Sequence, residues 1–258
     1  MVERLKRLVP GQISTVLLVK AVIFGLLLLY VQSRDFALLP AFIFVAAAFV
    51  MYMQPLFRTF SVLVSWTALV SLCLFVTSQF AIAFRETVFA AHLPTGMVLF
   101  SIFFGFLFYL LLGIKNMMFL RRKQWYYVLN LAVLYLGFGL FFNAGSGVSF
   151  VLKSLGLFFF VALLVREFFK FHEQENSRLR AVAILIAAFV IMQFAWAITL
   201  LPIGFSSSAS LLVALSFILT EYIQRYLQGD LSARFIRLNL LFLLTLICVI
   251  FFSSTWRL

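Results

Sequence analysis

Residues 96–114 read GMVLFSIFFGFLFYLLLGI, a run of nineteen residues without a charged side chain. A helix of about 20 mainly apolar residues crosses the hydrocarbon core of a bilayer. The run is followed by Lys115 and then by Arg121, Arg122 and Lys123. The same alternation of a long apolar run with a short polar linker continues along the chain, and it predicts a helical membrane protein.

Eight further segments have a similar length and apolar character. The pattern predicts about nine transmembrane helices in one all-α domain that covers residues 1–258. The expected spans are 13–32, 36–53, 60–84, 96–114, 125–142, 147–165, 181–202, 208–225 and 238–256. The linkers between these spans are too short to fold as separate soluble domains.

The composition also indicates lipid as the main solvent of this chain. Hydrophobic residues make up 65% of the sequence and charged residues 11%, whereas soluble domains carry about 25% charged residues. The formal net charge is +12, but the basic residues are divided among short linkers and form no stripe on a soluble fold. We therefore expect no nucleic-acid partner.

The positions of Lys and Arg predict the orientation. Because these residues are retained on the cytoplasmic side during insertion, we expect a cytoplasmic N-terminus and, after nine crossings, a C-terminus outside. Fifteen of the 20 lie in the N-terminal segment or in every second linker, namely Arg4, Lys6, Arg7, Arg58, Lys115, Arg121, Arg122, Lys123, Arg166, Lys170, Arg178, Arg180, Arg225, Arg234 and Arg237.

The first apolar run favours an uncleaved first span. It is longer than the hydrophobic region of a signal peptide, which has about 7–15 residues, and no small-x-small cleavage site follows it. Together with the short linkers, this favours a bacterial inner (plasma) membrane as the location.

Ionisable side chains within spans are costly, so they are candidates for function. Lys20, Asn130 and Glu221 are expected at similar depths in the cytoplasmic half of the membrane. We favour a Lys20 that snorkels to the surface or forms an ion pair with Glu221, while Glu221 also contacts Arg225 at i+4. An ion or proton site is the alternative. A proton path usually has carboxylates deep in the membrane, and none of the eight Asp and Glu is expected there.

A second polar layer is expected in the outer half of the membrane. Two spans begin there, and helix N-termini present free N–H groups and a partial positive charge. An outward-facing site for an anion or a lipid headgroup is therefore one interpretation, and capping serines with a snorkelling lysine is the other. The residues of this candidate site are Lys153, Gln193, Asn143, Ser206, Ser207 and Ser208.

Two linkers on the cytoplasmic side are candidates for interactions. Arg121, Arg122 and Lys123 precede an aromatic group at 125–127, an arrangement typical of a headgroup-level belt that contacts anionic lipids. The linker 166–180 is the longest on this side, and we expect it to be the docking surface for any soluble protein partner.

The residues that carry common catalytic chemistries are not arranged for them. The two histidines, His92 and His172, are expected on opposite faces of the membrane, so neither a base for Ser146 nor a pair of haem ligands is predicted. No phosphate-binding glycine motif is present, and Cys73 and Cys248 have no metal-ligand spacing. We therefore assign no catalytic residue, metal or cofactor.

These observations favour a non-enzymatic membrane protein that acts as a scaffold or as the membrane subunit of a larger assembly. The alternative is a transporter or flippase for a lipid-like or anionic small molecule, with an outward-facing site near Lys153. A membrane enzyme that acts on lipid-linked substrates is the third interpretation.

Overall fold

The computed structural model describes residues 10–54, 62–85, 93–116, 119, 121–143, 149–171 and 177–253. These residues form nine α-helices and no strand. Among them, five helices are long and apolar enough to cross a membrane, namely Ser14–Ser33, Pro94–Lys115, Arg122–Asn143, Leu179–Thr199 and Phe205–Gln228. The expectation of an all-α membrane protein is thus confirmed at this level.

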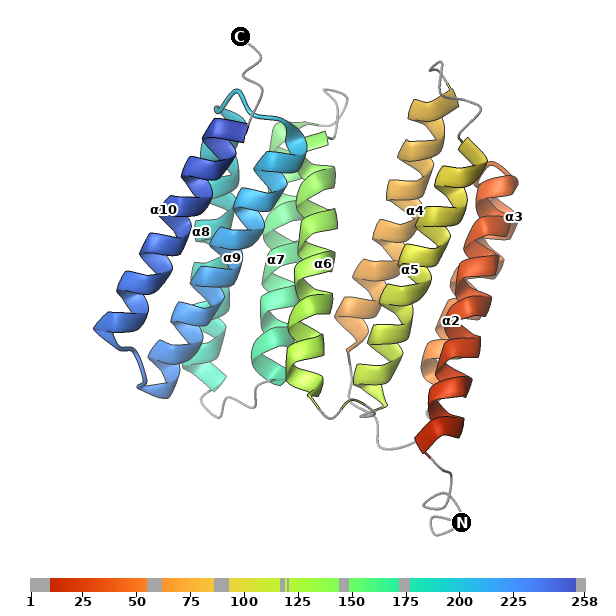
Figure 1. Cartoon of the computed structure of the whole chain (residues 1–258), viewed down its shortest axis with the longest axis horizontal. Coiled ribbons are helices and arrows are strands. Elements are labelled where there is room, and N and C mark those ends of the chain that lie inside the picture. The colour runs from red at the N-terminus through yellow and green to blue at the C-terminus, as the bar shows by residue number, and fades with distance from the viewer. Residues whose placement is uncertain are drawn as a thin grey trace. The chain divides into compact units, whose positions relative to one another are not determined.

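Unit 1 comprises the chain up to Leu129 and is one of two compact units into which the residue contacts group. Its helices are α2 (Pro10–Ser33), α3 (Leu38–Met53), α4 (Leu63–Arg85) and α5 (Leu93–Lys115) (Figure 1). Helix α2 packs against both α3 and α5, and α4 packs against α5. The core is aromatic: the rings of Phe24 and Phe108 stack with their centroids 4.2 Å apart, and both side chains are fully buried.

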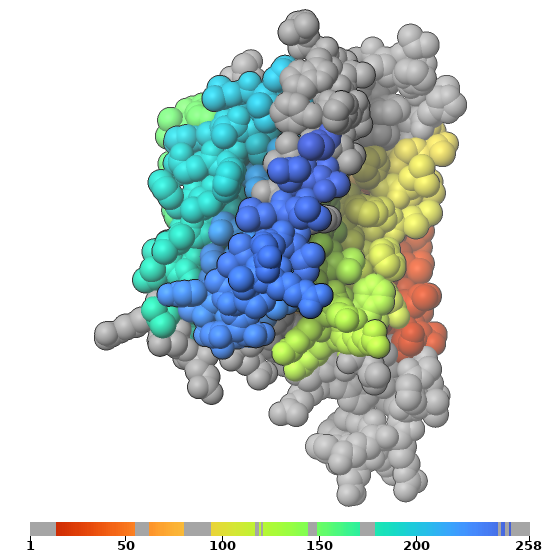
Figure 2. All heavy atoms as spheres, turned by 60° about the vertical axis from the view of Figure 1, so that its left-hand side comes forward, coloured from red at the N-terminus to blue at the C-terminus, as the bar shows by residue number. Residues whose placement is uncertain are grey.

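Unit 2 runs from Asn130 to Leu258. It contains α7 (Phe150–Phe171), α8 (Ser177–Thr199), α9 (Phe205–Gln228) and α10 (Ala233–Ser253). Each of these helices packs against its neighbour in the chain. Helix α10, dark blue in Figure 2, lies at the surface of this unit, and its leucines 238, 240, 241 and 244 are exposed. The remaining helix, α6 (Arg122–Asn143), contains the boundary between the two units.

Helix α3 is unusually short. Its 16 residues span about 24 Å at 1.5 Å per residue, whereas the hydrocarbon core is about 30 Å thick. The turn that precedes α3 is tight, because Asp35 and Phe36 adopt left-handed backbone angles with φ of 54° and 56°. The last carbonyl groups of a helix have no intrahelical partner, so those of α3 need donors from elsewhere.

Several helix ends differ from the expected spans. Helix α7 extends to Phe171 instead of ending at 165, and α8 begins at Ser177 instead of 181. Much of the expected linker 166–180 is therefore helical, and its residues 172–176, including His172, lie outside the described residues. The physical reason is that the apolar face continues past Arg166, because Phe168 and Phe169 are almost completely buried.

Candidate functional site

Two lysines of unit 1 donate hydrogen bonds to the C-terminal end of α3. Lys20 Nζ on α2 lies 3.3 Å from the carbonyl oxygen of Met51 and 3.4 Å from that of Gln54. Lys115 Nζ, at the end of α5, donates to the carbonyl oxygen of Tyr52. The last four carbonyls of a helix lack intrahelical partners and carry a partial negative charge. The two ammonium groups supply both the donors and the positive charge that this end of α3 requires.

Tyr52 holds Lys115 in a second way. The Lys115 ammonium group lies 3.8 Å from the centroid of the Tyr52 ring, close enough for a cation–π interaction. The Tyr52 ring in turn lies 5.5 Å from the ring of Trp66 on α4. Both Lys115 and Tyr52 are buried. Residues from α2, α3, α4 and α5 therefore meet around the end of α3, and we call Lys20, Lys115 and Tyr52 the lysine cluster.

The hydrogen-bond partners of Lys20 within the lysine cluster do not include Glu221. Lys20 lies in unit 1 and Glu221 in unit 2, so the expected ion pair between them stays a prediction. Within the described part of unit 1, the Lys20 ammonium group donates to two backbone carbonyls, and the expected snorkelling stays a prediction. Tyr52 was not singled out from the sequence, and Lys115 was expected only as one of the basic residues of the cytoplasmic linker.

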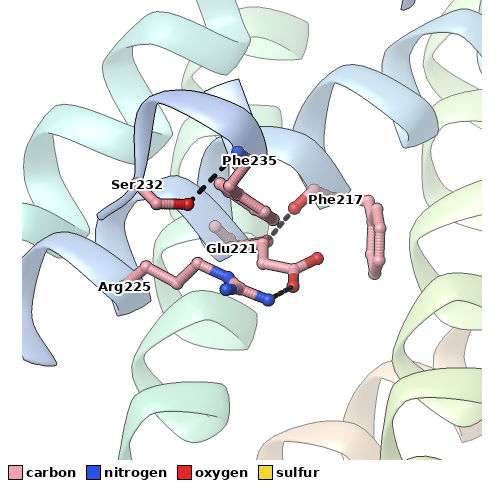
Figure 3. Close-up of polar contacts among 6 residues, drawn as sticks. Phe217, Glu221, Arg225, Ser232 and Phe235 are labelled. Carbon is pink, nitrogen blue, oxygen red and sulfur yellow. Dashed lines mark hydrogen bonds and ion pairs between the residues drawn. The ribbon is translucent and has the colours of Figure 1, made fainter. Parts of the chain in front are cut away.

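Glu221 of unit 2 forms the expected contact with Arg225. The guanidinium Nη2 lies 3.3 Å from Glu221 Oε1 along α9 (Figure 3). Arg225 Cζ also lies 3.9 Å from the centroid of the Phe235 ring on α10. Both charged side chains are partly exposed. The Glu221–Arg225 pair therefore lies beside the turn that connects α9 to α10.

That connection is built from local backbone features. Gly229 follows α9 with a φ of 73°, a left-handed conformation that glycine adopts without strain. Ser232 Oγ accepts a hydrogen bond from the Phe235 backbone N–H at 3.3 Å as α10 begins. Tyr222 donates from its hydroxyl to the carbonyl oxygen of Ile236 at 3.2 Å. Glu221 thus belongs to a group of contacts that stabilise the turn from α9 to α10.

The residues of the expected outer site lie on several helices of unit 2. Lys153 is half-buried on α7, Gln193 is exposed on α8, and Asn143 is exposed at the end of α6. Helices α7 and α8 meet near this level, because Trp196 Nε1 donates to Ser154 Oγ at 2.8 Å. A shared site around Lys153 stays a prediction.

The three serines before the expected eighth span are inside α9, which begins at Phe205. Ser206 Oγ lies 2.9 Å from the hydroxyl of Tyr135 on α6. Ser208 is buried, and its hydroxyl donates to the carbonyl oxygen of Gly204 at 3.1 Å. The N-cap residue of α9 is Gly204, which makes no side-chain cap. The structure therefore places Ser206 and Ser208 in helix contacts, and neither is the N-cap of α9.

The basic group Arg121, Arg122 and Lys123 lies at the start of α6. Arg121 and Lys123 are exposed, and Arg122 is partly buried. Positive side chains in the first turn of a helix oppose its dipole. Helix stability thus gives no reason for this group, which is consistent with the predicted lipid headgroup contacts.

Glu167 on α7 is a buried acid that the sequence did not reveal. Only 5% of the residue is exposed, although it was expected in a linker. The neighbouring Phe168 and Phe169 could have indicated that the helix continues, because apolar residues at this spacing extend a buried face. Among the described residues, no group of three or more His, Cys, Asp or Glu is arranged to hold a metal ion.

A groove runs along the outside of the α2–α5 pair and has a volume of about 560 Å³. Its walls are large apolar side chains, namely Leu18, Val22 and Leu26 on α2 and Val98, Ile102 and Phe106 on α5. All six are exposed by more than 40%. The volume falls within the range of about 300–1,000 Å³ that is usual for ligand sites, and the lining is almost entirely apolar.

Small residues form the floor of the groove. Ala21 and Gly25 on α2 face Ser101 and Gly105 on α5, and each pair has the four-residue spacing that lets membrane helices approach closely. A Cβ added to Gly105 would lie 3.2 Å from the carbonyl oxygen of Ala21. The two helices therefore cross with their backbones nearly in contact. The four-residue spacing of these small residues is visible in the sequence. Similar spacings occur in other helices of the chain, so the spacing alone did not indicate this contact.

Some buried polar atoms of the described residues have no hydrogen-bond partner. The hydroxyl of Ser101 is one, and both amide atoms of Gln32 near the end of α2 are others. Ser101 is 5% exposed and lines the groove. Other helical serines, such as Ser216, donate to the carbonyl four residues earlier. The hydroxyl of Ser101 is therefore buried below the groove surface, and it would reach a molecule in the groove only after the side chain rotates.

No protein-family model, no curated protein and no solved structure matches this chain.

Proposed function

We propose that this protein is a non-enzymatic membrane component, which acts as a scaffold or as the membrane subunit of a larger assembly. The distribution of Lys and Arg supports nine spans with a cytoplasmic N-terminus and a C-terminus outside. The short linkers support a bacterial inner membrane. Five of the described helices have the length and apolar character of spans, and the other four follow the remaining expected segments.

The α2–α5 groove is the observation that carries this proposal. Its exposed walls and its floor of small residues follow two helices that are long enough to span the membrane. A helix surface consists of ridges that pack into grooves of this kind. Because lipid tails are as apolar as leucine, helices associate in membranes through close packing and interhelical hydrogen bonds. The unpartnered Ser101 hydroxyl would supply one such hydrogen bond once its side chain turns toward the groove, so the favoured occupant is a membrane helix of a partner subunit.

Photo-crosslinking in native membranes tests this function. A photoreactive residue at Ile102, which is 64% exposed, should form a protein adduct of defined mass. Replacing Val151 on α7, which is 63% exposed, by the same photoreactive residue is the matched control, and this variant should label mainly lipid. Val98→Trp, which fills the groove, should remove the adduct at Ile102, whereas Leu152→Trp should not. Equal labelling at both positions, or lipid adducts alone at Ile102, would contradict a helix-binding groove.

Transport of a lipid-like or anionic small molecule remains the alternative function. It is favoured by the half-buried position of Lys153 on α7, close in sequence to the Ser154–Trp196 hydrogen bond. Uptake into vesicles that contain the purified protein separates the two functions. Transport requires a substrate-dependent flux that Lys153→Ala abolishes, whereas a scaffold gives no flux with either protein.

A further inference from the structure

Among the described residues, the lysine cluster brings two positive charges together without a carboxylate. In the described part of unit 1, Asp35 is the only acidic residue. It follows the opposite end of α2 from the cluster, roughly 20 Å from Lys20 at the helical rise of 1.5 Å per residue. Neither Lys20 nor Lys115 forms an ion pair there; their described partners are backbone carbonyls and one aromatic ring.

The end of α3 offsets only part of this charge. A helix C-terminus carries about half of an elementary negative charge, whereas the two ammonium groups carry two positive charges. Charged side chains at membrane depth are costly unless they are paired or reach water. The described residues therefore leave more than one positive charge to be balanced at this place.

The geometry leaves Lys20 able to bind an anion directly. An ammonium group has three N–H donors, and two of those of Lys20 donate to carbonyl oxygens at 3.3 and 3.4 Å. Lys20 is half-buried, and its bond to Gln54 lies on the exposed side. Lys115 is buried and donates to the carbonyl oxygen of Tyr52. It adds positive charge to the site without direct contact with the anion.

The level of the cluster indicates what kind of anion is available. Helix α5 ends at Lys115 and α3 ends at Met53, so two of the expected spans finish beside the cluster. Span ends lie near the boundary between hydrocarbon and headgroups. We propose that Lys20 and Lys115 form a binding site for the phosphate group of an anionic membrane lipid. This site is separate from the α2–α5 groove, because Lys20 contacts α3 whereas Gly25 faces α5.

Thermal unfolding of the full chain in phosphatidylcholine-containing micelles tests this site. Added phosphatidylglycerol should raise the unfolding temperature. The concentration that gives half of this rise should increase at least tenfold in Lys20→Gln and Lys115→Gln. Lys170→Gln, which alters an exposed lysine at the end of α7, is the control and should leave it unchanged. Lys20→Arg, which keeps the positive charge, should retain most of the response.

Inorganic phosphate distinguishes the two sources of the same chemistry. If phosphate alone gives the full rise and phosphatidylglycerol adds nothing, the lipid assignment is overturned. If both glutamine variants unfold earlier but respond to phosphatidylglycerol as the unmodified protein does, the lysines only cap α3 and the proposal fails.

A second measurement needs no variant, so it holds even if the glutamine variants do not fold. Amine acylation of the unmodified protein, followed by mass spectrometry, should show that phosphatidylglycerol protects Lys20 and leaves the exposed Lys170 labelled. Equal acylation of Lys20 with phosphatidylglycerol and with phosphatidylcholine would overturn the site.

Discussion

Gly25 and Ser101 meet backbone to backbone where α2 crosses α5, because a Cβ placed on Gly25 would lie 3.0 Å from the Ser101 carbonyl oxygen. A backbone oxygen in a packed helix has little freedom to move away. The crossing therefore depends on the absence of a side chain at this position. The groove depends on it too, since its floor is this close contact.

Gly25→Ala should destabilise the protein. Overpacking of a tight contact costs about 1–3 kcal/mol, and the better helix propensity of alanine returns at most about 1 kcal/mol. Gly156→Ala on α7 is the matched control, because nothing lies within 4 Å of its Cβ position. Thermal unfolding in detergent should show a loss for Gly25→Ala and a small gain for Gly156→Ala. Equal shifts for both would mean that α2 and α5 are not in close contact.

Lys115→Met should also destabilise the protein. The carbonyl oxygen of Tyr52 would lose its buried donor, and an unsatisfied buried acceptor costs about 1–3 kcal/mol. Lys123→Met is the control, because Lys123 is exposed in the first turn of α6 and its charge opposes the helix dipole. That change should stay within about 0.5 kcal/mol. The two variants are compared by unfolding in zwitterionic detergent, where no anionic lipid contributes. A neutral Lys115→Met would show that the end of α3 does not need this donor.

The sequence predicted where Lys20 lies along its helix but not what it binds. Its partners are backbone carbonyls at the end of α3, and every residue carries a carbonyl, so no side-chain pattern indicates the contact. Glu221 is the acid expected at a similar depth, so an ion pair with Glu221 was predicted instead. Only the short length of α3, compared with the membrane thickness, could have indicated an unsatisfied helix end.

The extent of α7 was missed for a different physical reason. Arg166 and Glu167 interrupt the apolar run, so the span was expected to end before them. The buried faces of Phe168 and Phe169 outweigh these charges and continue the helix to Phe171. The all-α class was predictable because the length of the apolar runs alone indicates it. The helix ends depend on contacts between helices, which cannot be read from the sequence.

Glu221→Gln should have only a small effect on stability. The Glu221–Arg225 pair is partly exposed, and pairs of this kind contribute about 0–1 kcal/mol. Gly229→Ala should cost more, about 1–2 kcal/mol, because an L-residue is strained in the left-handed conformation that Gly229 adopts. Unfolding of the two variants side by side measures the difference. A larger loss for Glu221→Gln would mean that the carboxylate has a role beyond the α9–α10 connection.

Ser154→Ala should weaken the contact between α7 and α8. The indole N–H of Trp196 would lose its acceptor at 2.8 Å, which costs about 1 kcal/mol for a partly buried group. Ser154→Thr keeps the hydroxyl and serves as the control. The measurement is hydrogen exchange at the indole nitrogen, followed by NMR of the labelled tryptophan. If exchange at Trp196 is equally slow in Ser154→Ala, the hydroxyl is not its acceptor.

Ser101→Ala should leave the fold intact but weaken partner binding. The Ser101 hydroxyl is buried without a partner in the described structure, so its removal should be neutral or should stabilise the isolated protein by up to about 1 kcal/mol. A partner helix in the groove would use this hydroxyl, and the photo-crosslinked adduct at Ile102 should then decrease in Ser101→Ala. Ser216→Ala, which removes a hydroxyl that donates to Leu212 at 2.7 Å, is the matched control for the loss of a buried hydroxyl. If the adduct is unchanged in Ser101→Ala, the occupant of the groove is held by apolar packing and does not use the serine.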